Sequence, residues 1–248
     1  MLATQLKYDL VMFSRELFYM VFSIIIPPVT YIFMGQLFGD NTYAGSLNYA
    51  EMYTPSFILL ITFSVVFFAF GFDQVVNRTN GVEKRISISP VPKRILLISS
   101  ILKSIIITSL GFLFIQVIGI VVYGLSFHLL TFLTSYGFFI ILNTVLLVIS
   151  SAIYSLFQEM KSALVFSIII FQVVMFTGDF SLPVSMMPKF IQAVAQLNPL
   201  YHMNHLFIDI WNQQFVFSKN TWISISYILF IFIISLLVLQ FSKRKSVK

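Results

Sequence analysis

Residues 73–94 read DQVVNRTNGVEKRISISPVPKR, a polar and basic stretch between two long apolar segments. The whole chain has a mean hydropathy of +0.95 and is only 10% charged. Five cations nevertheless fall within this stretch: Arg78, Lys84, Arg85, Lys93 and Arg94. Because charged side chains are costly in lipid, we expect the stretch in water or at a headgroup surface. The apolar segments on both sides of it are predicted to cross a membrane.

The composition is that of an integral membrane protein. Of the 248 residues, 58% are hydrophobic and 17% are aromatic, which is more apolar surface than a water-surrounded core of this size can cover. Residues 1–16 are not predicted to be a signal peptide, because they mix acidic and basic residues and end in no small-residue cleavage site. The absence of cysteine excludes disulfides, thiolate metal ligands and a cysteine nucleophile.

Hydropathy and length predict an all-α protein with six membrane-spanning helices, because about 20 residues cross a bilayer core of roughly 30 Å. We expect the spans at residues 17–38, 55–72, 95–125, 132–156, 164–179 and 222–241. Apolar residues at spacings of three and four in residues 1–16 predict an interfacial helix before the first span. Residues 180–220, interrupted by Pro183, Pro188 and Pro199, predict short interfacial or re-entrant helices.

The distribution of Lys and Arg orients these helices. With six spans, both termini fall on the same side as residues 75–92, and only Lys189 and Lys219 fall on the other. Since Lys and Arg accumulate in cytoplasmic loops, both termini are predicted to be cytoplasmic. The net charge of +6 therefore reflects membrane topology, and no nucleic-acid partner is expected. The high content of Ile, Phe, Lys and Asn suggests that the protein comes from a low-GC bacterium. We therefore expect it in the bacterial cell membrane.

Two adjacent prolines, Pro27 and Pro28, lie within the first predicted span. Proline removes backbone donors and kinks a helix, which a bundle of helices tolerates when neighbours satisfy the freed carbonyls. We expect a kink that serves packing, with a hinge as the alternative. Gly35 and Gly39 follow as one GxxxG pattern, a spacing that permits close contact between helices.

The sequence lacks the motifs of nucleotide and metal chemistry. It contains no G-x-x-x-x-G-K-[ST] and no H-E-x-x-H, so we expect no enzyme activity and no metal or cofactor in this chain. No acidic residue lies deep in a predicted span, which argues against an ion-driven transporter. The alternative is a membrane-embedded metallohydrolase that uses His202, His205 and Asp209, which could share one helix face.

Two stretches resemble the permeases of ABC-2 type transporters. R-T-N-G-V-E-K-R-I-S-I-S-P-V, from Arg78, is similar to the coupling segment of that family, where G-T-L-E precedes a P-V before the third span. F-T-G-D-F-S-L-P and M-P-K-F-I-Q-A-V-A-Q-L-N-P-L-Y are similar to the family's G-x-x-F-P, l-P-x-W-l-Q and N-P-l-x-Y signatures. The resemblance covers residues 1–248 as a single transmembrane domain, which is similar to those of drug and antibiotic exporters of type V.

The resemblance implies a permease that works with a second permease chain, as a homodimer or heterodimer, and with two ABC ATPase subunits that hold ATP and Mg. Residues 75–92 would include the coupling helix, with the following contacts to the ATPase: Arg78, Gly81, Glu83, Lys84, Arg85 and Pro90. The resemblance also implies an external re-entrant region over residues 180–220. Its predicted site residues, with one just before it, are Gly178, Pro183, Pro188, Asn198 and Pro199.

The function implied is export of an amphipathic or hydrophobic substrate, such as a drug, an antimicrobial peptide or a lipid-linked molecule. ATP-driven closure of the ATPase dimer would push on the coupling helix and rearrange the spans. A membrane immunity or sensor protein that transports nothing is a second interpretation. It differs in needing no ATPase.

Overall fold

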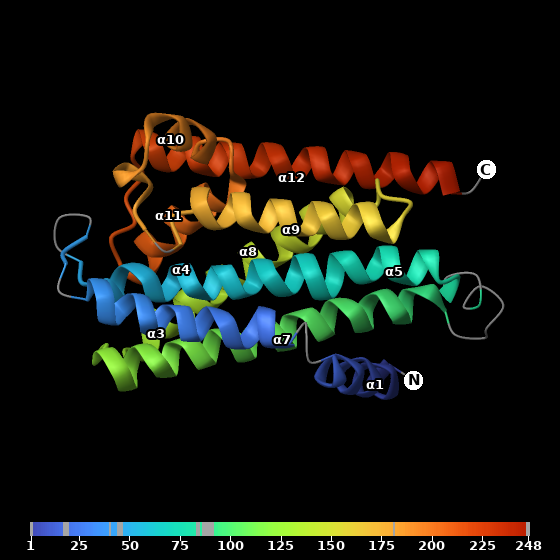
Figure 1. Ribbon diagram of the computed structural model, residues 1–248, viewed down its shortest axis with the longest axis horizontal. Helices are drawn as coiled ribbons and strands as arrows, with labels where there is room; N and C mark the ends of the chain where they lie inside the picture. The colour runs from blue at the N-terminus through green and yellow to red at the C-terminus, as the bar shows by residue number, and fades with distance from the viewer. Residues whose placement is uncertain are drawn as a thin grey trace.

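The computed structural model describes residues 2–16, 20–39, 41–43, 47–82, 85, 92–180 and 182–246. It is a bundle of long helices that run along one axis, with both termini at the same end (Figure 1). Helix accounts for 83% of it, and no strand occurs in the residues described. The predicted all-α class is therefore confirmed.

The elements follow one another in a simple order. They are α1 (Leu2–Arg15), the π-helix η1 (Val21–Ile25), α3 (Ile26–Phe38), α4 (Tyr49–Ser64), the π-helix η2 (Val65–Phe72), α5 (Asp73–Thr79), α7 (Lys93–Tyr123), α8 (Leu129–Tyr154), α9 (Met160–Thr177), the 3₁₀-helix η3 (Val184–Met186), α10 (Lys189–Ala195), α11 (Pro199–Trp211) and α12 (Lys219–Ser246). Residues 1–16, where an interfacial helix was expected, contain α1.

Five helical segments are long and apolar enough to cross a membrane. They are Tyr49–Thr79, which joins α4, η2 and α5, and the segments formed by α7, α8, α9 and α12. Within the first predicted span, the apolar helix Ser23–Phe38 is shorter, and residues 17–19 lie outside the described residues. A layout of six spans therefore stays a prediction, while a multi-pass membrane protein is supported.

The second span begins earlier than the predicted start at residue 55. Asn48 Oδ1 accepts a hydrogen bond from the Glu51 N–H over 2.9 Å, and Glu51 Oε2 accepts one from the Asn48 N–H over 2.8 Å. This capping box satisfies two backbone donors that a helix start leaves unpaired, so α4 begins at Tyr49. Pro55 consequently lies inside the helix.

Pro27 and Pro28 mark a change of helix type. The wider turn of η1 ends just before them, and they occupy the first turn of α3. Because proline cannot donate to the preceding carbonyls, the π-helical turn takes up the mismatch in backbone hydrogen bonding. Both prolines are buried, which fits the packing role. A hinge at these residues stays a prediction.

The core is centred on the second span. Every residue of α4 except Glu51 is buried, and α4 contacts α3, α7, α8 and α11. Glycines permit the closest of these approaches: a Cβ on Gly111 of α7 would press on Ile61 of α4, and one on Gly71 would overlap with Ser150 and Tyr154 of α8. The segment that leads into residues 73–79 is thus closely packed against its neighbours.

We expect Gly71→Ala to lower the free energy of unfolding of the detergent-solubilised protein by about 1–3 kcal/mol, as overpacking does in a close-packed core. The added methyl would collide with the Ser150 hydroxyl, which donates to Val66 O over 2.9 Å. Gly137→Ala on α8 is the matched control, because nothing lies within 4 Å of a Cβ there. Thermal unfolding of both variants measures the effect, and equal melting temperatures would contradict the packing of η2 against α8.

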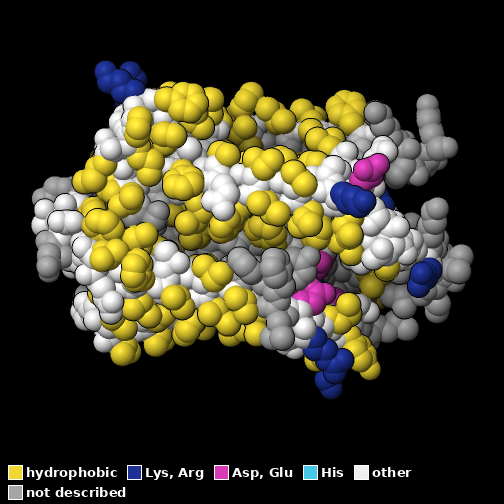
Figure 2. All heavy atoms as spheres, viewed as in Figure 1, with side chains coloured by type: hydrophobic (Ala, Val, Ile, Leu, Met, Phe, Trp, Pro, Cys, Tyr) yellow, Lys and Arg dark blue, Asp and Glu magenta, His cyan; other side chains and the backbone are white. Residues whose placement is uncertain are grey.

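The outer surface is apolar along most of its length. Figure 2 shows hydrophobic side chains across the visible face and most of the charged side chains near the end where the termini lie. On α7, α8, α9 and α12, large apolar side chains are exposed, among them Val121, Leu130, Ile169 and Phe230. Such a surface suits contact with lipid tails or with a second apolar protein surface.

Candidate functional site

The first candidate site is the helix end that extends from the apolar bundle near the termini (Figure 1). Here α5 continues η2 and ends at Thr79. Gly81 follows with φ of +68°, a left-handed conformation that glycine adopts without steric cost. The Arg85 N–H then donates to Gly81 O over 3.1 Å, which is the spacing of a helical turn. Among the predicted coupling residues, three lie outside the described residues: Glu83, Lys84 and Pro90.

An ion pair joins α5 to α7. Lys103 Nζ lies 3.1 Å from Asp73 Oδ2, and the two side chains are only 11% and 27% exposed. Because both charges are largely removed from water, each depends on the other for compensation. Lys103 lies near the start of the third predicted span, where a lysine could extend its aliphatic stem along lipid and keep its ammonium in water. In the structure its ammonium meets a specific carboxylate instead.

The interfacial helix α1 meets the same ion pair. Asp9 accepts hydrogen bonds from the Ser99 hydroxyl of α7, over 2.5 Å, and from the Gln5 amide, over 2.8 Å. Just after α1, partial burial raises the pKa of the Glu16 carboxyl, the charge of Asp73 raises it further, and the charge of Lys103 acts in the opposite direction. The bond between Asp9 and Ser99 therefore connects α1 to α7, which also carries the Lys103 partner of Asp73.

Arg78 joins α5 to the turn between α8 and α9. Its Nη1 donates to Phe157 O over 3.0 Å and to Ser155 O over 3.5 Å. These carbonyls follow the last residue of α8, where a helix lacks backbone donors and a cation is favoured. Gln74 Nε2 adds a bond of 3.0 Å to Ser151 Oγ. A displacement of α5 would therefore act on α7 and α8 through direct contacts.

The opposite end of the bundle is covered by η3, α10 and α11 (Figure 1). Gly178 follows α9, and Asp179 has φ of +61°, so the chain turns back there. Asn204 Nδ2 of α11 donates to Gly178 O over 3.1 Å and to Asp179 O over 3.0 Å. Asn198 Nδ2 donates to Thr177 Oγ1 over 2.9 Å. Two buried asparagines thus fix the turn that follows the fifth predicted span.

The prolines of this region lie at the starts of its short helices. Pro183 and Pro188 immediately precede η3 and α10, and Pro199 is the first residue of α11. A helix start suits proline because the N–H groups of the first turn have no partner in the helix. The structure places Gly178, Asn198 and the three prolines in one cap, remote from α5.

His202, His205 and Asp209 do not form one site. His202 lies 3.0 Å from Ser224 Oγ and 2.9 Å from Gln196 O through its two ring nitrogens. His205 Nε2 lies 3.3 Å from Asp179 Oδ2. Across the described part of the chain, no group of three or more His, Cys, Asp or Glu residues could hold a metal ion. The geometry gives the metallohydrolase interpretation no support.

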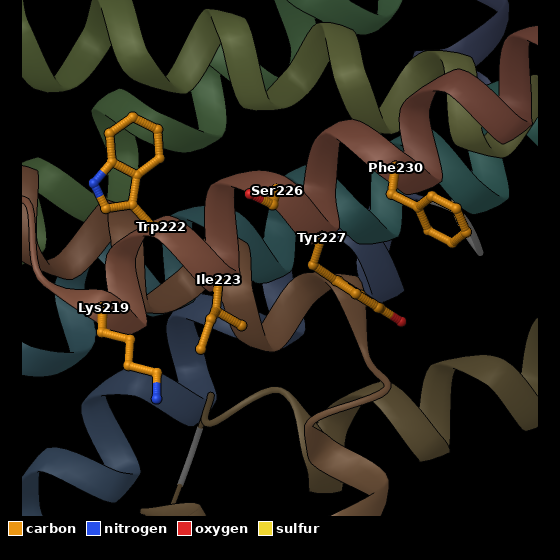
Figure 3. Close-up of a pocket in the computed structure, with 6 residues that line it drawn as sticks. All are labelled: Lys219, Trp222, Ile223, Ser226, Tyr227 and Phe230. Carbon is orange, nitrogen blue, oxygen red and sulfur yellow. The ribbon is translucent and has the colours of Figure 1, made fainter.

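A hollow of about 580 Å³ lies beside α12, and Figure 3 shows the side chains that line it. Its lining comes from one helix: Lys219, Trp222, Ile223, Ser226, Tyr227 and Phe230. The Tyr227 hydroxyl is directed to Leu197 O, to which it donates over 2.6 Å. Ligand pockets fix a substrate by a few converging polar groups within an enclosed apolar wall. A hollow formed along one helix face lacks that enclosure, so we assign no substrate to it.

Sequence reasoning missed the partners that make α5 part of the bundle. Asp73 and Lys103 lie near the ends of two neighbouring apolar segments. An acidic and a basic residue at such positions could have indicated an ion pair between the two helices. Nothing in the sequence indicated that Gln74 would meet Ser151. The resemblance implies that Arg78 contacts the ATPase, which stays a prediction; the sequence did not indicate its bonds to the α8–α9 turn.

A family model described as ABC-2 type transporter matches residues 2–212. The match extends from the start of α1 to the end of α11, so it includes both α5 and the cap. A comparison with curated proteins finds no match.

Proposed function

Because the chain belongs to the ABC-2 type transporter family, we propose that it is the permease subunit of an ABC exporter, which moves an amphipathic or hydrophobic substrate out of a bacterial cell. The energy comes from the hydrolysis of ATP, which a separate ATPase subunit binds together with Mg. The chain itself is not an enzyme. Its termini and α5 face the cytoplasm, and the cap over α10 and α11 lies outside. The observation that carries the proposal is the attachment of α5 to both α7 and α8.

The ATPase contacts the segment that follows α5. The left-handed Gly81 turns the chain out of the α5 axis, and the exposed Arg85 closes the helical turn that begins at Gly81. A guanidinium at this position offers charged hydrogen bonds to acidic groups of a soluble partner. Movement of the ATPase would then displace α5 as a lever. The ion pair with Lys103 and the bonds of Arg78 carry that displacement into the bundle.

A second permease chain covers the exposed apolar faces of α3 and α9. These two helices lie on either side of α4 in Figure 1. They expose apolar side chains, among them Val29, Phe33 and Leu37 on α3, and Ile168, Ile169 and Phe176 on α9. The substrate path follows this interface. Since α4 is buried within its own chain, we place α3 and α9, rather than α4, on the wall of the path.

Co-purification from native membranes in mild detergent tests the proposal. We expect an ABC ATPase to be recovered with the wild-type chain, and Arg85→Ala to reduce its recovery by about two- to fivefold, the effect of losing an exposed ionic contact of up to ~1 kcal/mol. Lys189→Ala in α10 is the matched control, because it removes a cation at the opposite end.

Recovery of the folded chain without any ATPase would contradict the exporter proposal. An immunity or sensor protein needs no ATPase, so that result would favour this second function. Equal losses of ATPase in Arg85→Ala and Lys189→Ala would instead show that the contact is not at the segment after α5.

A further inference from the structure

A second cavity, of about 210 Å³, lies where α7 and α8 meet the start of α4 and the end of α11. Its walls are tied together: Asn212 Nδ2 donates to Glu51 O over 3.0 Å, and Gln213 Nε2 donates to Thr131 Oγ1. Gln213 has φ of +55°, a conformation that a residue with a side chain adopts only when its surroundings hold it there. The cavity is therefore a fixed feature of the fold.

Two residues that line this cavity carry buried oxygens without a partner. Gln116 is 9% exposed and Ser135 is 1% exposed, and neither Gln116 Oε1 nor Ser135 Oγ has a hydrogen-bond partner in the part of the chain that the structure describes. A buried polar atom without a partner costs roughly 1–3 kcal/mol. Both residues line the cavity, and a donor there that reached these oxygens would remove that cost.

The charge of the wall indicates what kind of donor fits. The lining residues include one acidic residue, Glu51, and one histidine, His128, and neither Lys nor Arg. Glu51 Oε2 accepts one bond from the Asn48 N–H, and a carboxylate can accept about four, so acceptor capacity remains. The rings of Phe132 and Trp211 also line the cavity, and aromatic faces attract cations. Acceptors, a negative charge and aromatic rings together favour a small cation.

The volume limits the size of that cation. At ~30 Å³ for each water molecule, the cavity holds about seven waters, and it is smaller than the ~300–1,000 Å³ of pockets for drug-sized ligands. A quaternary ammonium has no N–H and would leave Gln116 Oε1 and Ser135 Oγ unpaired. A primary ammonium offers three N–H donors.

We propose that this cavity binds a primary ammonium group, carried either by a small free amine or by the ethanolamine headgroup of a lipid. The ammonium lies between the Glu51 carboxylate and the oxygens of Gln116 and Ser135. The site belongs to one chain and involves none of the residues that attach α5. It is therefore independent of the proposed coupling to an ATPase.

Thermal unfolding of the full chain in detergent, with ethanolamine and with choline at equal ionic strength, tests this site. At about 100 times its Kd, a ligand that binds only the folded state raises the melting temperature of a protein of this size by about 5–10 °C. We expect that rise with ethanolamine and not with choline. Ser135→Ala should reduce the rise and Gln116→Leu should abolish it, while Gln214→Leu, an exposed position outside the cavity lining, keeps it.

The Gln116→Leu variant also gives a readout without ligand. Because it removes an unpaired buried oxygen, its melting temperature without amine should equal or exceed that of the wild type. Nanodiscs separate the two sources of the ammonium. A higher melting temperature in ethanolamine lipid than in choline lipid assigns the site to a headgroup, and a rise with free ethanolamine in choline lipid assigns it to a small amine.

Three results would overturn the proposal. Equal shifts with ethanolamine and choline would show a general effect of charge. A shift that survives both Gln116→Leu and Ser135→Ala would place the amine elsewhere. No shift with ethanolamine and no difference between the two lipids would show that the cavity holds water only.

Discussion

Replacing Lys103 with methionine is expected to lower the free energy of unfolding by about 3 kcal/mol, the lower end of the loss found when one partner of a buried ion pair is removed. The lower end applies because the Asp73 side chain is still 27% exposed. Without the ammonium, the Asp73 carboxyl is left in a largely desolvated place without its partner, near the acidic side chains of Asp9 and Glu16. Thermal and denaturant unfolding in detergent measures the loss.

A double variant separates loss of the pair from loss of side-chain packing. Lys103→Met combined with Asp73→Leu removes both charges and keeps apolar side chains, so it should recover most of the lost stability. Lys161→Met, an exposed cation at the start of α9, is the matched control and should have little effect. If the double variant were as unstable as Lys103→Met alone, the ion pair would not be the cause of the loss.

The spans of this fold were predictable because their signal is local. A run of apolar residues long enough to cross lipid identifies α7, α8, α9 and α12 without knowledge of their neighbours. The prolines that begin α10 and α11 act in the same local way. The early start of α4 was also visible, since Asn48 followed three residues later by Glu51 is a capping-box spacing; the prediction placed the start at Pro55 and missed it.

The candidate sites depend on contacts between residues far apart in the sequence. Gln74 and Ser151 are 77 positions apart, and Asn204 and Gly178 are 26 apart. Which polar groups meet is set by the rotation and depth of each helix against its neighbours, and these depend on close packing at residues such as Gly71. Hydropathy carries no information on the rotation of a helix or on its depth against its neighbours. The resemblance to a family located the coupling segment, but it could not show that Arg78 turns toward the α8–α9 turn.

Arg78→Ala is expected to leave the ATPase bound and to reduce the stimulation of ATP hydrolysis by the permease about tenfold or more, the range of a coupling free energy of ~1–3 kcal/mol. The prediction follows from the bonds of Arg78 Nη1 to Phe157 O and Ser155 O, which connect α5 to the end of α8. Arg78→Lys should be intermediate, because an ammonium keeps the charge but lacks the planar fork of donors. ATP hydrolysis by the complex in nanodiscs, with Lys161→Ala as control, measures the effect.

The connection between α5 and the α8–α9 turn can also be measured by a distance, which needs no substrate. The chain has no cysteine of its own, so labels attach only to introduced cysteines. Spin labels on cysteines introduced at Asn77 of α5 and Ser162 of α9, both exposed, report the distance across the α8–α9 turn. In the wild type we expect one distance with and without ATP, since Arg78 makes the two ends move together. In Arg78→Ala the distance should broaden and change with ATP. Loss of the ATPase from Arg78→Ala would instead mean that Arg78 contacts the ATPase directly. Unchanged ATP hydrolysis together with one fixed distance would mean that the displacement of α5 reaches the bundle through Asp73 and Lys103 and does not need Arg78.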